Sequence, residues 1–181
     1  AYWAARNGVQ TALMAPTEIL AEQHYRTLGG LLEPLGVRCV LLTGSLTGGE
    51  KQRVRLALAG GQAELAIGTH ALLSQTTEFA RLGMVITDEQ HRFGVAQRAA
   101  LSEKGRGAHL LVMSATPIPR TLALILYGDL DVSILDELPP GRQRTDTFLV
   151  NETYRARLNG FLRKEVQAGH QCYVVCPSVE E

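Results

Sequence analysis

Paired cysteines are missing from this chain of 181 residues. Its three cysteines, Cys39, Cys172 and Cys176, are odd in number and provide no disulfide framework. Three residues separate Cys172 from Cys176 in a strand-like run, a pattern that does not fit paired zinc ligands. We therefore expect reduced thiols and a cytosolic compartment.

Long apolar runs and a dominant charge are missing as well. No apolar run approaches the roughly 18 residues of a membrane span, and no signal peptide is visible, so we expect no membrane association. Lys and Arg together number 18, as do Asp and Glu, and the formal net charge is zero. This balance argues against a tight, passive nucleic-acid binder, but it permits a motor that grips a backbone locally.

Strand-like apolar runs alternate with segments of helical composition. The strand-like runs are residues 11–15, 37–43, 64–68, 84–87 and 109–114, and the helical segments are 18–32, 49–59 and 118–127. No internal repeat or low-complexity tract interrupts them. This alternation predicts an α/β fold with a parallel sheet covered by helices on both faces.

A break follows at Leu138-Pro139-Pro140-Gly141-Arg142, where paired prolines and a glycine suit a linker. We predict a first domain over residues 1–138, a linker over 139–146 and the start of a second α/β domain over 147–181. In the last segment we expect strands at 147–150 and 171–177 and a helix at 154–168. The chain opens like the end of a helix and closes directly after a strand, so we expect an internal fragment of a larger polypeptide.

The stretch most informative about function is Val85-Ile86-Thr87 followed by Asp88-Glu89-Gln90-His91. A short apolar run is typical of a buried parallel strand, and ligands collect at the carboxyl ends of such strands. A carboxylate there suits hydrated magnesium, and a second one can serve as general base for a water. The pattern looks like the Walker B motif of a superfamily 2 nucleic-acid motor of the DExH type. Taken alone, it is also compatible with a polar loop or the first turn of a helix.

Other predicted strands also end in small or hydroxyl residues. Pro16 and Thr17 open a helix, with Thr17 as its N-cap, and free backbone N–H groups there suit phosphate. Gly44 and the pair Thr69-His70 follow two further strands, where small residues let a nucleic-acid backbone approach. Ser114-Ala115-Thr116 ends the last strand of the first domain. Each pattern is equally compatible with an ordinary turn.

No phosphate-binding P-loop is present in the sequence. The stretch from Gly44 to Lys51 has a similar glycine spacing, but it lacks adjacent Gly-Lys-Ser/Thr, so we reject it as an ATP site. His70, His91 and His109 match no zinc spacing, and we expect surface or hydrogen-bonded histidines, with His91 reserved for the DExH motif.

Taken together, four motifs and the linker resemble the RecG family of branch-migration helicases. The motifs are Met14-Ala15-Pro16-Thr17-Glu18-Ile19-Leu20-Ala21-Glu22-Gln23-His24, Gly68-Thr69-His70-Ala71-Leu72, Asp88-Glu89-Gln90-His91-Arg92-Phe93-Gly94-Val95 and Ser114-Ala115-Thr116-Pro117-Ile118-Pro119-Arg120-Thr121-Leu122. The linker is part of Tyr127-Gly128-Asp129-Leu130-Asp131-Val132-Ser133-Ile134-Leu135-Asp136-Glu137-Leu138-Pro139-Pro140-Gly141-Arg142. The resemblance covers nearly the whole chain.

The resemblance implies a bacterial, cytoplasmic, ATP-driven translocase that remodels stalled forks and Holliday junctions. It implies a first RecA-like domain without its P-loop strand and the start of a second one. Branched double-stranded DNA would be the substrate, single-strand-binding protein a partner and the monomer the working form. The P-loop lysine would precede Ala1, and the arginine finger would follow Glu181. We therefore expect the isolated fragment to be inactive.

The resemblance also implies roles for individual residues. Asp88 would hold magnesium through water, and Glu89 would orient and deprotonate the water that attacks ATP. Gln90 and His91 would relay the nucleotide state to the coupling residues. The coupling residues would be Ser114, Ala115 and Thr116, and the DNA-facing residues Pro16, Thr17, Gly44, Thr69 and His70.

Three other functions stay open at this point. The transcription-repair coupling translocase shares the Asp88-Glu89 and Thr116 motifs, although it usually lacks a linker of this kind. A non-catalytic DNA- or protein-binding module on a degenerate motor fold would have no P-loop at all. A metal-dependent hydrolase that uses Asp88, Glu89 and His91 would turn over without ATP.

Overall fold

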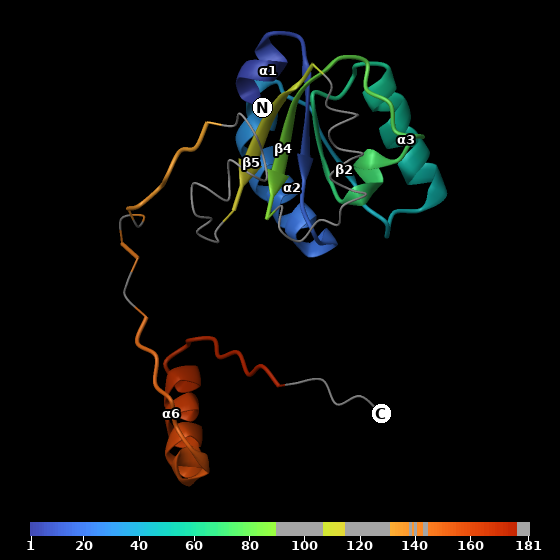
Figure 1. The fold of residues 1–181 in the computed structure, drawn as a ribbon. Helices are drawn as coiled ribbons and strands as arrows, with labels where there is room; N and C mark the ends of the chain where they lie inside the picture. The colour runs from blue at the N-terminus through green and yellow to red at the C-terminus, as the bar shows by residue number, and fades with distance from the viewer. Residues whose placement is uncertain (90–106, 115–130, 138, 140, 143–144, 177–181) are drawn as a thin grey trace. The chain divides into compact units, whose positions relative to one another are not determined.

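The computed structural model describes residues 1–89, 107–114, 131–137, 139, 141–142 and 145–176 (Figure 1). The chain divides into two compact units, residues 1–130 and 131–181. The helix predicted at 118–127 lies outside the described residues.

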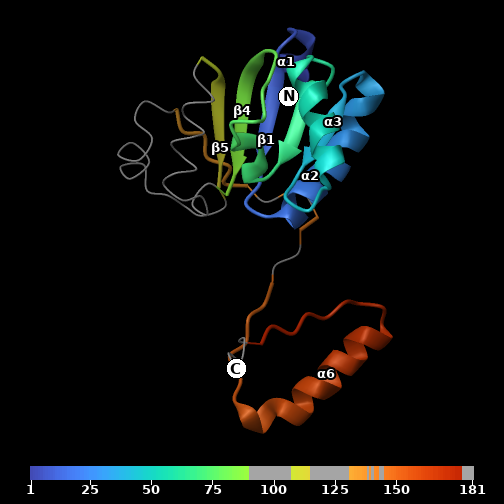
Figure 2. The same ribbon diagram turned by 90° about the vertical axis from the view of Figure 1, so that its right-hand side faces the viewer.

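Unit 1 is built on a five-stranded parallel sheet. Its strands are β1 (Gln10–Met14), β2 (Cys39–Leu42), β3 (Leu65–Gly68), β4 (Leu82–Asp88) and β5 (His109–Met113). They lie in the order β2-β3-β1-β4-β5, and every neighbouring pair is parallel (Figures 1 and 2). The five predicted strands and the parallel sheet are confirmed, although the observed bounds differ by a few residues.

Helices cover both faces of this sheet. Helices α1 (Tyr2–Arg6) and α2 (Glu18–Leu32) pack on one face, against a cluster that includes Leu13, Ile67 and Ile86. Helix α3 (Gly48–Ala59) packs on the other face, against a cluster that includes Met14, Leu42 and Val85. The described residues of this unit also include two 3₁₀ helices, Glu33–Leu35 and His70–Leu73.

Side-chain caps fix where the two longest described helices of unit 1 begin. The Thr17 hydroxyl accepts a hydrogen bond from the Leu20 N–H at 3.3 Å, which confirms Thr17 as the N-cap of α2. Thr47 caps α3 in a capping box, because its hydroxyl accepts from the Glu50 N–H while the Glu50 carboxylate accepts from the Thr47 N–H. The Thr47 hydrogen bonds hold the pKa of Glu50 below its usual range.

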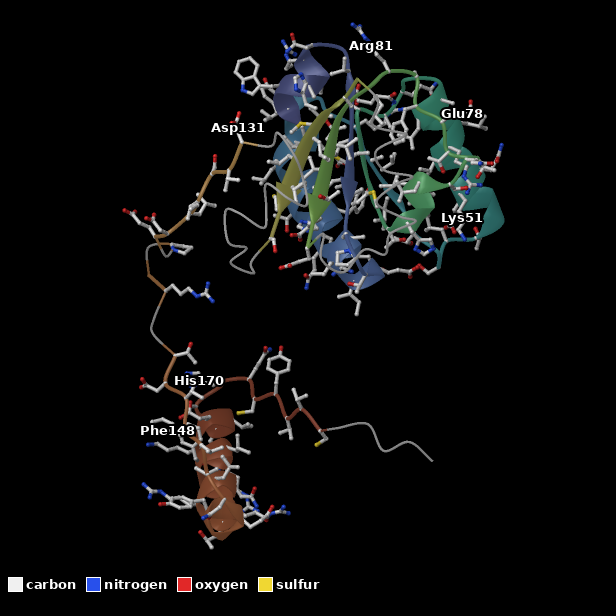
Figure 3. The ribbon with its side chains drawn as sticks, in the orientation of Figure 1. Lys51, Glu78, Arg81, Asp131, Phe148 and His170 are labelled. Carbon is white, nitrogen blue, oxygen red and sulfur yellow. The ribbon has the colours of Figure 1, made fainter. Side chains whose placement is uncertain are left out.

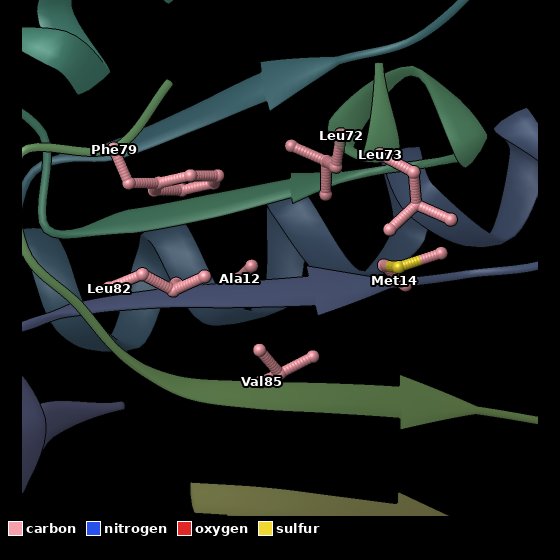
Figure 4. A pocket seen from close by; sticks show the side chains of 7 residues that line it. All are labelled: Ala12, Met14, Leu72, Leu73, Phe79, Leu82 and Val85. Atoms are coloured by element: carbon pink, nitrogen blue, oxygen red, sulfur yellow. The ribbon is translucent and has the colours of Figure 1, made fainter. Parts of the chain in front are cut away.

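The core is apolar and closely filled. A cavity of about 10 Å³ between β1, β4 and the 3₁₀ helix His70–Leu73 is lined by seven apolar side chains (Figure 4). A space of that size without polar partners does not hold an ordered water, so it is a packing gap and no ligand site. Burial raises the pKa of the Cys39 thiol to about 11, so Cys39 stays protonated at neutral pH.

One buried polar side chain, Gln10, ties the strand entrances together. Its amide nitrogen donates to the carbonyl oxygens of Leu58 and Ala63, at 2.9 and 2.8 Å. Its amide oxygen accepts from the Arg81 N–H at 2.9 Å. The side chain is thereby satisfied, and it joins the start of β1 to the end of α3 and the entrance to β4.

Unit 2 contains α6 (Arg155–Gln167), preceded by a 3₁₀ helix at Glu152–Tyr154. The helix predicted at 154–168 is thus confirmed, but the strands predicted at 147–150 and 171–177 are wrong where the structure describes them, over 147–150 and 171–176. A strand needs a hydrogen-bonded neighbour, and the described residues of this unit provide none. None of the described helices is long and apolar enough to cross a membrane.

Candidate active site

The carboxyl ends of the strands meet at one edge of the sheet. Met14, the last residue of β1, lies beside Gly68 of β3 and Thr87 of β4. Asp88, the last residue of β4, lies beside Met113, the last residue of β5. Each predicted site residue within the described ranges therefore follows or ends a strand at this edge, which is where open parallel sheets bind ligands.

Asp88 is the last residue of β4, and its carboxylate is held by a histidine. The Nε2 atom of His24, from α2, lies 2.9 Å from Oδ2 of Asp88. The side chains of His24 and Asp88 are 28% and 21% exposed, so solvent reaches both only in part. The second carboxylate oxygen, Oδ1, takes no part in this hydrogen bond and can accept one from a further group.

Glu89 follows with an unusual backbone conformation. Its φ is 51°, and among the described residues no other non-glycine residue has a positive φ. Non-glycine residues in this region carry strain that persists where surrounding structure holds them, often at active sites. The Glu89 N–H donates to the Met113 carbonyl oxygen at 3.0 Å, which fastens the strained residue to the end of β5.

The coupling residues are described only in part. Ser114 follows β5 directly, one residue after the Met113 carbonyl that accepts from Glu89. The structure therefore brings Ser114 next to the DExH segment along the sheet edge. Gln90, His91, Ala115 and Thr116 lie outside the described residues.

The predicted DNA-facing residues lie at the same edge, on three different loops. Pro16 and Thr17 connect β1 to α2, Gly44 follows β2, and Thr69 and His70 follow β3. Thr17 and His70 are exposed, whereas Thr69 is 3% exposed and therefore buried. Because it is buried, the Thr69 side chain is not accessible to a DNA backbone.

Gly44 is held between two charged side chains of neighbouring helices. The Glu18 carboxylate, in the first turn of α2, accepts from the Ser45 N–H at 3.0 Å. The Lys51 ammonium, on α3, donates to the Gly44 carbonyl oxygen at 2.6 Å (Figure 3). A Cβ at Gly44 would lie 2.8 Å from Glu18 Oε1, so the Glu18 carboxylate would have to shift to accommodate a larger residue here. Lys51 is thus hydrogen-bonded to a carbonyl at the start of its own segment, in keeping with the rejection of this segment as an ATP site.

These hydrogen bonds shift the acidity of Glu18. The Ser45 side chain is the main cause that holds the pKa of Glu18 below its usual range, with smaller contributions from the Ser45 and Gly44 backbone. The carboxylate is therefore ionised at neutral pH and keeps the loop after β2 attached to the start of α2.

Sequence reasoning missed the roles of His24 and Glu18. His24 meets a residue 64 positions away, so no local pattern marks the pair. Glu18 reads as an ordinary acid in the first turn of a helix, where acids are common. The only available sequence signal for these two residues was the N-cap Thr17. It fixes where α2 begins and therefore which α2 residues face the sheet edge.

A magnesium ion would fit this edge through Asp88. Among the described residues, no three His, Cys, Asp or Glu side chains gather into a ready-made metal site. Magnesium bound through one carboxylate, waters and the phosphates of a nucleotide requires no such cluster. The donor chemistry therefore suits magnesium brought in with a nucleotide.

An open hollow of about 380 Å³ lies elsewhere, between α2, β2 and α3. Its lining includes Tyr25, Leu41 and Arg53 and none of the predicted site residues. We assign the site to the strand ends, because the carboxylates and the strained backbone lie there.

Comparison with known proteins identifies the family. A family model described as DEAD/DEAH box helicase matches residues 2–125. The ATP-dependent DNA helicase RecG of Synechocystis sp. is 51% identical over 178 residues, which covers 98% of this chain and 21% of that protein. RecG of Bacillus subtilis is 48% identical over 180 residues, which covers 99% of this chain and 26% of that protein.

A solved structure of RecG bound to a three-way DNA junction has the same architecture. It matches with a TM-score of 0.72 and 46% identity over 90% of this chain and 22% of that one. The predicted resemblance to RecG and the RecA-like α/β fold are confirmed. The chain spans about a fifth to a quarter of these relatives. The chain belongs to the DEAD/DEAH box helicase family.

Proposed function

We propose that the full-length protein containing this chain is an ATP-dependent DNA helicase that remodels branched double-stranded DNA, such as stalled forks and Holliday junctions. The observation that carries the proposal is the placement of Asp88 and Glu89 at the carboxyl end of β4, with Glu89 at φ 51°. The RecG relatives, one of them bound to a three-way junction, supply the substrate class.

In this proposal Glu89 is the general base. Its carboxylate would orient the attacking water and accept a proton as that water attacks the γ-phosphorus. The bond from the γ-phosphorus to the bridging oxygen would break in the same step, which releases ADP and phosphate. Asp88 would hold magnesium through water, and magnesium when bound neutralises charge on the phosphate oxygens. Gln90 and His91 would pass the nucleotide state to Ser114, Ala115 and Thr116.

The DNA-facing role belongs to the loops after β1, β2 and β3. Pro16, Thr17, Gly44 and His70 would lie along the DNA backbone, and Thr69 would support that surface from below because it is buried. Glu18 and Lys51 would keep the Gly44 loop in shape through their contacts with Ser45 and Gly44.

We further propose that residues 1–138 are the first motor domain, 139–146 the linker and 147–181 the start of the second. We expect a monomer in the bacterial cytoplasm, with single-strand-binding protein as a partner. The isolated 181 residues should neither hydrolyse ATP well nor unwind DNA, because the P-loop is not among them.

The test is ATP hydrolysis by the full-length protein with linear duplex and with forked DNA. Glu89→Gln removes the general base and should lower turnover by roughly 100-fold or more, while nucleotide binding stays close to wild type. Glu78→Gln makes the same chemical change at an exposed carboxylate (Figure 3) and should leave turnover unchanged.

The DNA dependence separates the alternatives. Turnover stimulated more by forked than by linear DNA, and lost in Glu89→Gln, supports the proposal. Stimulation that ignores branching points to the transcription-repair coupling translocase. A wild-type protein without ATP hydrolysis under either condition contradicts the proposal.

A further inference from the structure

The contact between His24 and Asp88 joins two segments with different predicted tasks. Asp88 is the carboxylate that would hold magnesium, at the end of β4. His24 lies on α2, the helix that begins right after Pro16 and Thr17 on the predicted DNA side. Their 2.9 Å contact is a direct connection between these two segments.

The packing of α2 fixes the position of this histidine. Ala21, three residues before His24 and on the same side of the helix, is completely buried. Leu20 and Leu28 pack against the cluster that contains Ile86. Ile86 and Asp88 are two residues apart on β4, so their side chains point to the same face of the sheet, where α2 lies.

The hydrogen bond between His24 and Asp88 has a defined donor and a defined acceptor. An ionised carboxylate only accepts hydrogen bonds, so the Nε2–H of His24 must be the donor and Oδ2 of Asp88 the acceptor. The hydrogen bond fixes the rotation of the carboxylate and commits Oδ2 to the protein. Oδ1 would then be the oxygen left to accept from the water shell of a metal ion.

We propose that His24 is a positioning residue that presents the Asp88 carboxylate to the magnesium of the bound nucleotide. The inference rests on the proposed function, because it takes Asp88 to be the magnesium-holding group. Hydrogen-bond partners of metal-holding groups commonly affect metal affinity by 10- to 100-fold. A merely structural ion pair would leave metal affinity unchanged.

The test compares three variants of the full-length protein. His24→Ala removes the donor. His24→Gln keeps an N–H donor at about the reach of Nε2. Thr27→Ala changes an exposed residue one turn further along α2 and serves as the matched control. For each variant we would measure ATP turnover against Mg²⁺ concentration and the binding of Mn²⁺ with a non-hydrolysable ATP analogue by calorimetry.

His24→Ala should raise the Mg²⁺ concentration for half-maximal turnover by about 10-fold and weaken Mn²⁺ binding by a similar factor. His24→Gln should recover most of the loss, and Thr27→Ala should match the wild type. A thermal unfolding curve for each variant distinguishes a folding defect from a metal-binding defect.

Two results would overturn the inference while leaving the proposed function intact. One is a His24→Ala variant with wild-type Mg²⁺ dependence and Mn²⁺ binding. The other is a variant whose turnover and melting temperature fall together with unchanged metal dependence, which marks a purely structural contact. A wild-type protein that hydrolyses no ATP would instead contradict the proposed function itself.

Discussion

Gly68 shows how neighbouring atoms can dictate a single residue. A Cβ at this position would overlap the Leu42 carbonyl oxygen on the adjacent strand, and Gly68 is itself buried. The carbonyl belongs to the sheet backbone, so it cannot move aside as a flexible side chain could. Glycine is therefore required at the end of β3, where the predicted DNA-facing loop begins.

Gly68→Ala should destabilise the protein by about 2–3 kcal/mol, at the upper end of the cost of overpacking, because the clash is with backbone. The matched control is Gly30→Ala, in α2, where no atom lies within 4 Å of an added Cβ. That change should stabilise the protein by about 0.5–1 kcal/mol through helix propensity. Urea unfolding of both variants measures the sign of each change in unfolding free energy, and equal changes in the two variants would contradict the prediction.

Individual residues of the candidate site differ in how well the sequence could predict them. The position of Asp88 and Glu89 at the end of a buried strand could be predicted because an apolar run that ends in two acids is a local pattern; their roles stay a prediction. The partner of Asp88 could not, because His24 lies 64 residues away and reaches it only through the packing of α2 on the sheet. The positive φ of Glu89 had no sequence signal either, since glutamate gives no hint of a left-handed backbone.

At the scale of elements, the capping box of α3 sets where that helix starts. Thr47 and Glu50 satisfy each other's backbone N–H groups at the first turn. Thr47→Ala should therefore cost about 1 kcal/mol in unfolding free energy at neutral pH, and Thr47→Ser should cost much less because it keeps the hydroxyl. Thermal or urea unfolding of the two variants gives the comparison.

The pH dependence of the cap follows from Glu50. Because the pKa of Glu50 is lowered in the folded state, its contribution is present above the pKa of the unfolded chain. It is lost as the pH falls through the folded pKa. The penalty of Thr47→Ala should therefore shrink in acid, and a penalty that grows below pH about 4 would contradict this account.

Elements were predictable wherever their limits are set locally. Helix α2 was predicted with its observed bounds, Glu18–Leu32, because a capping threonine precedes it. The strands of unit 1 were predictable because each is a short apolar run between turn residues. The strands expected at 147–150 and 171–177 failed because strand formation depends on a hydrogen-bonding neighbour that local sequence does not specify.

At the scale of the whole chain, the two units differ in how much they bury. Unit 1 has two apolar clusters, one on each face of its sheet. Among the described residues of unit 2 none is buried, and Leu135, Leu149 and Val175 are almost completely exposed. A 13-residue helix without a packed face is marginal in water.

Hydrogen exchange on the 181-residue polypeptide should reveal this difference. Amides of β1 and β3, in the centre of the sheet, should exchange on the order of 100-fold more slowly than those of α6. Exchange in β1 and β3 requires the core to open, whereas exchange in α6 does not. Equal protection of α6 and β1 would mean that unit 2 buries apolar surface that the structure does not show.

The hydrogen bond between His24 and Asp88 also gives α2 a narrow mechanical tolerance. His24 is the seventh residue of the helix, about 9 Å along the axis from its first residue. A tilt of about 5° about that end would move the imidazole by about 0.8 Å and stretch the 2.9 Å contact past the limit of a hydrogen bond. A displacement of the helix smaller than a side-chain rotation would therefore break the hydrogen bond and leave the Asp88 carboxylate free to rotate.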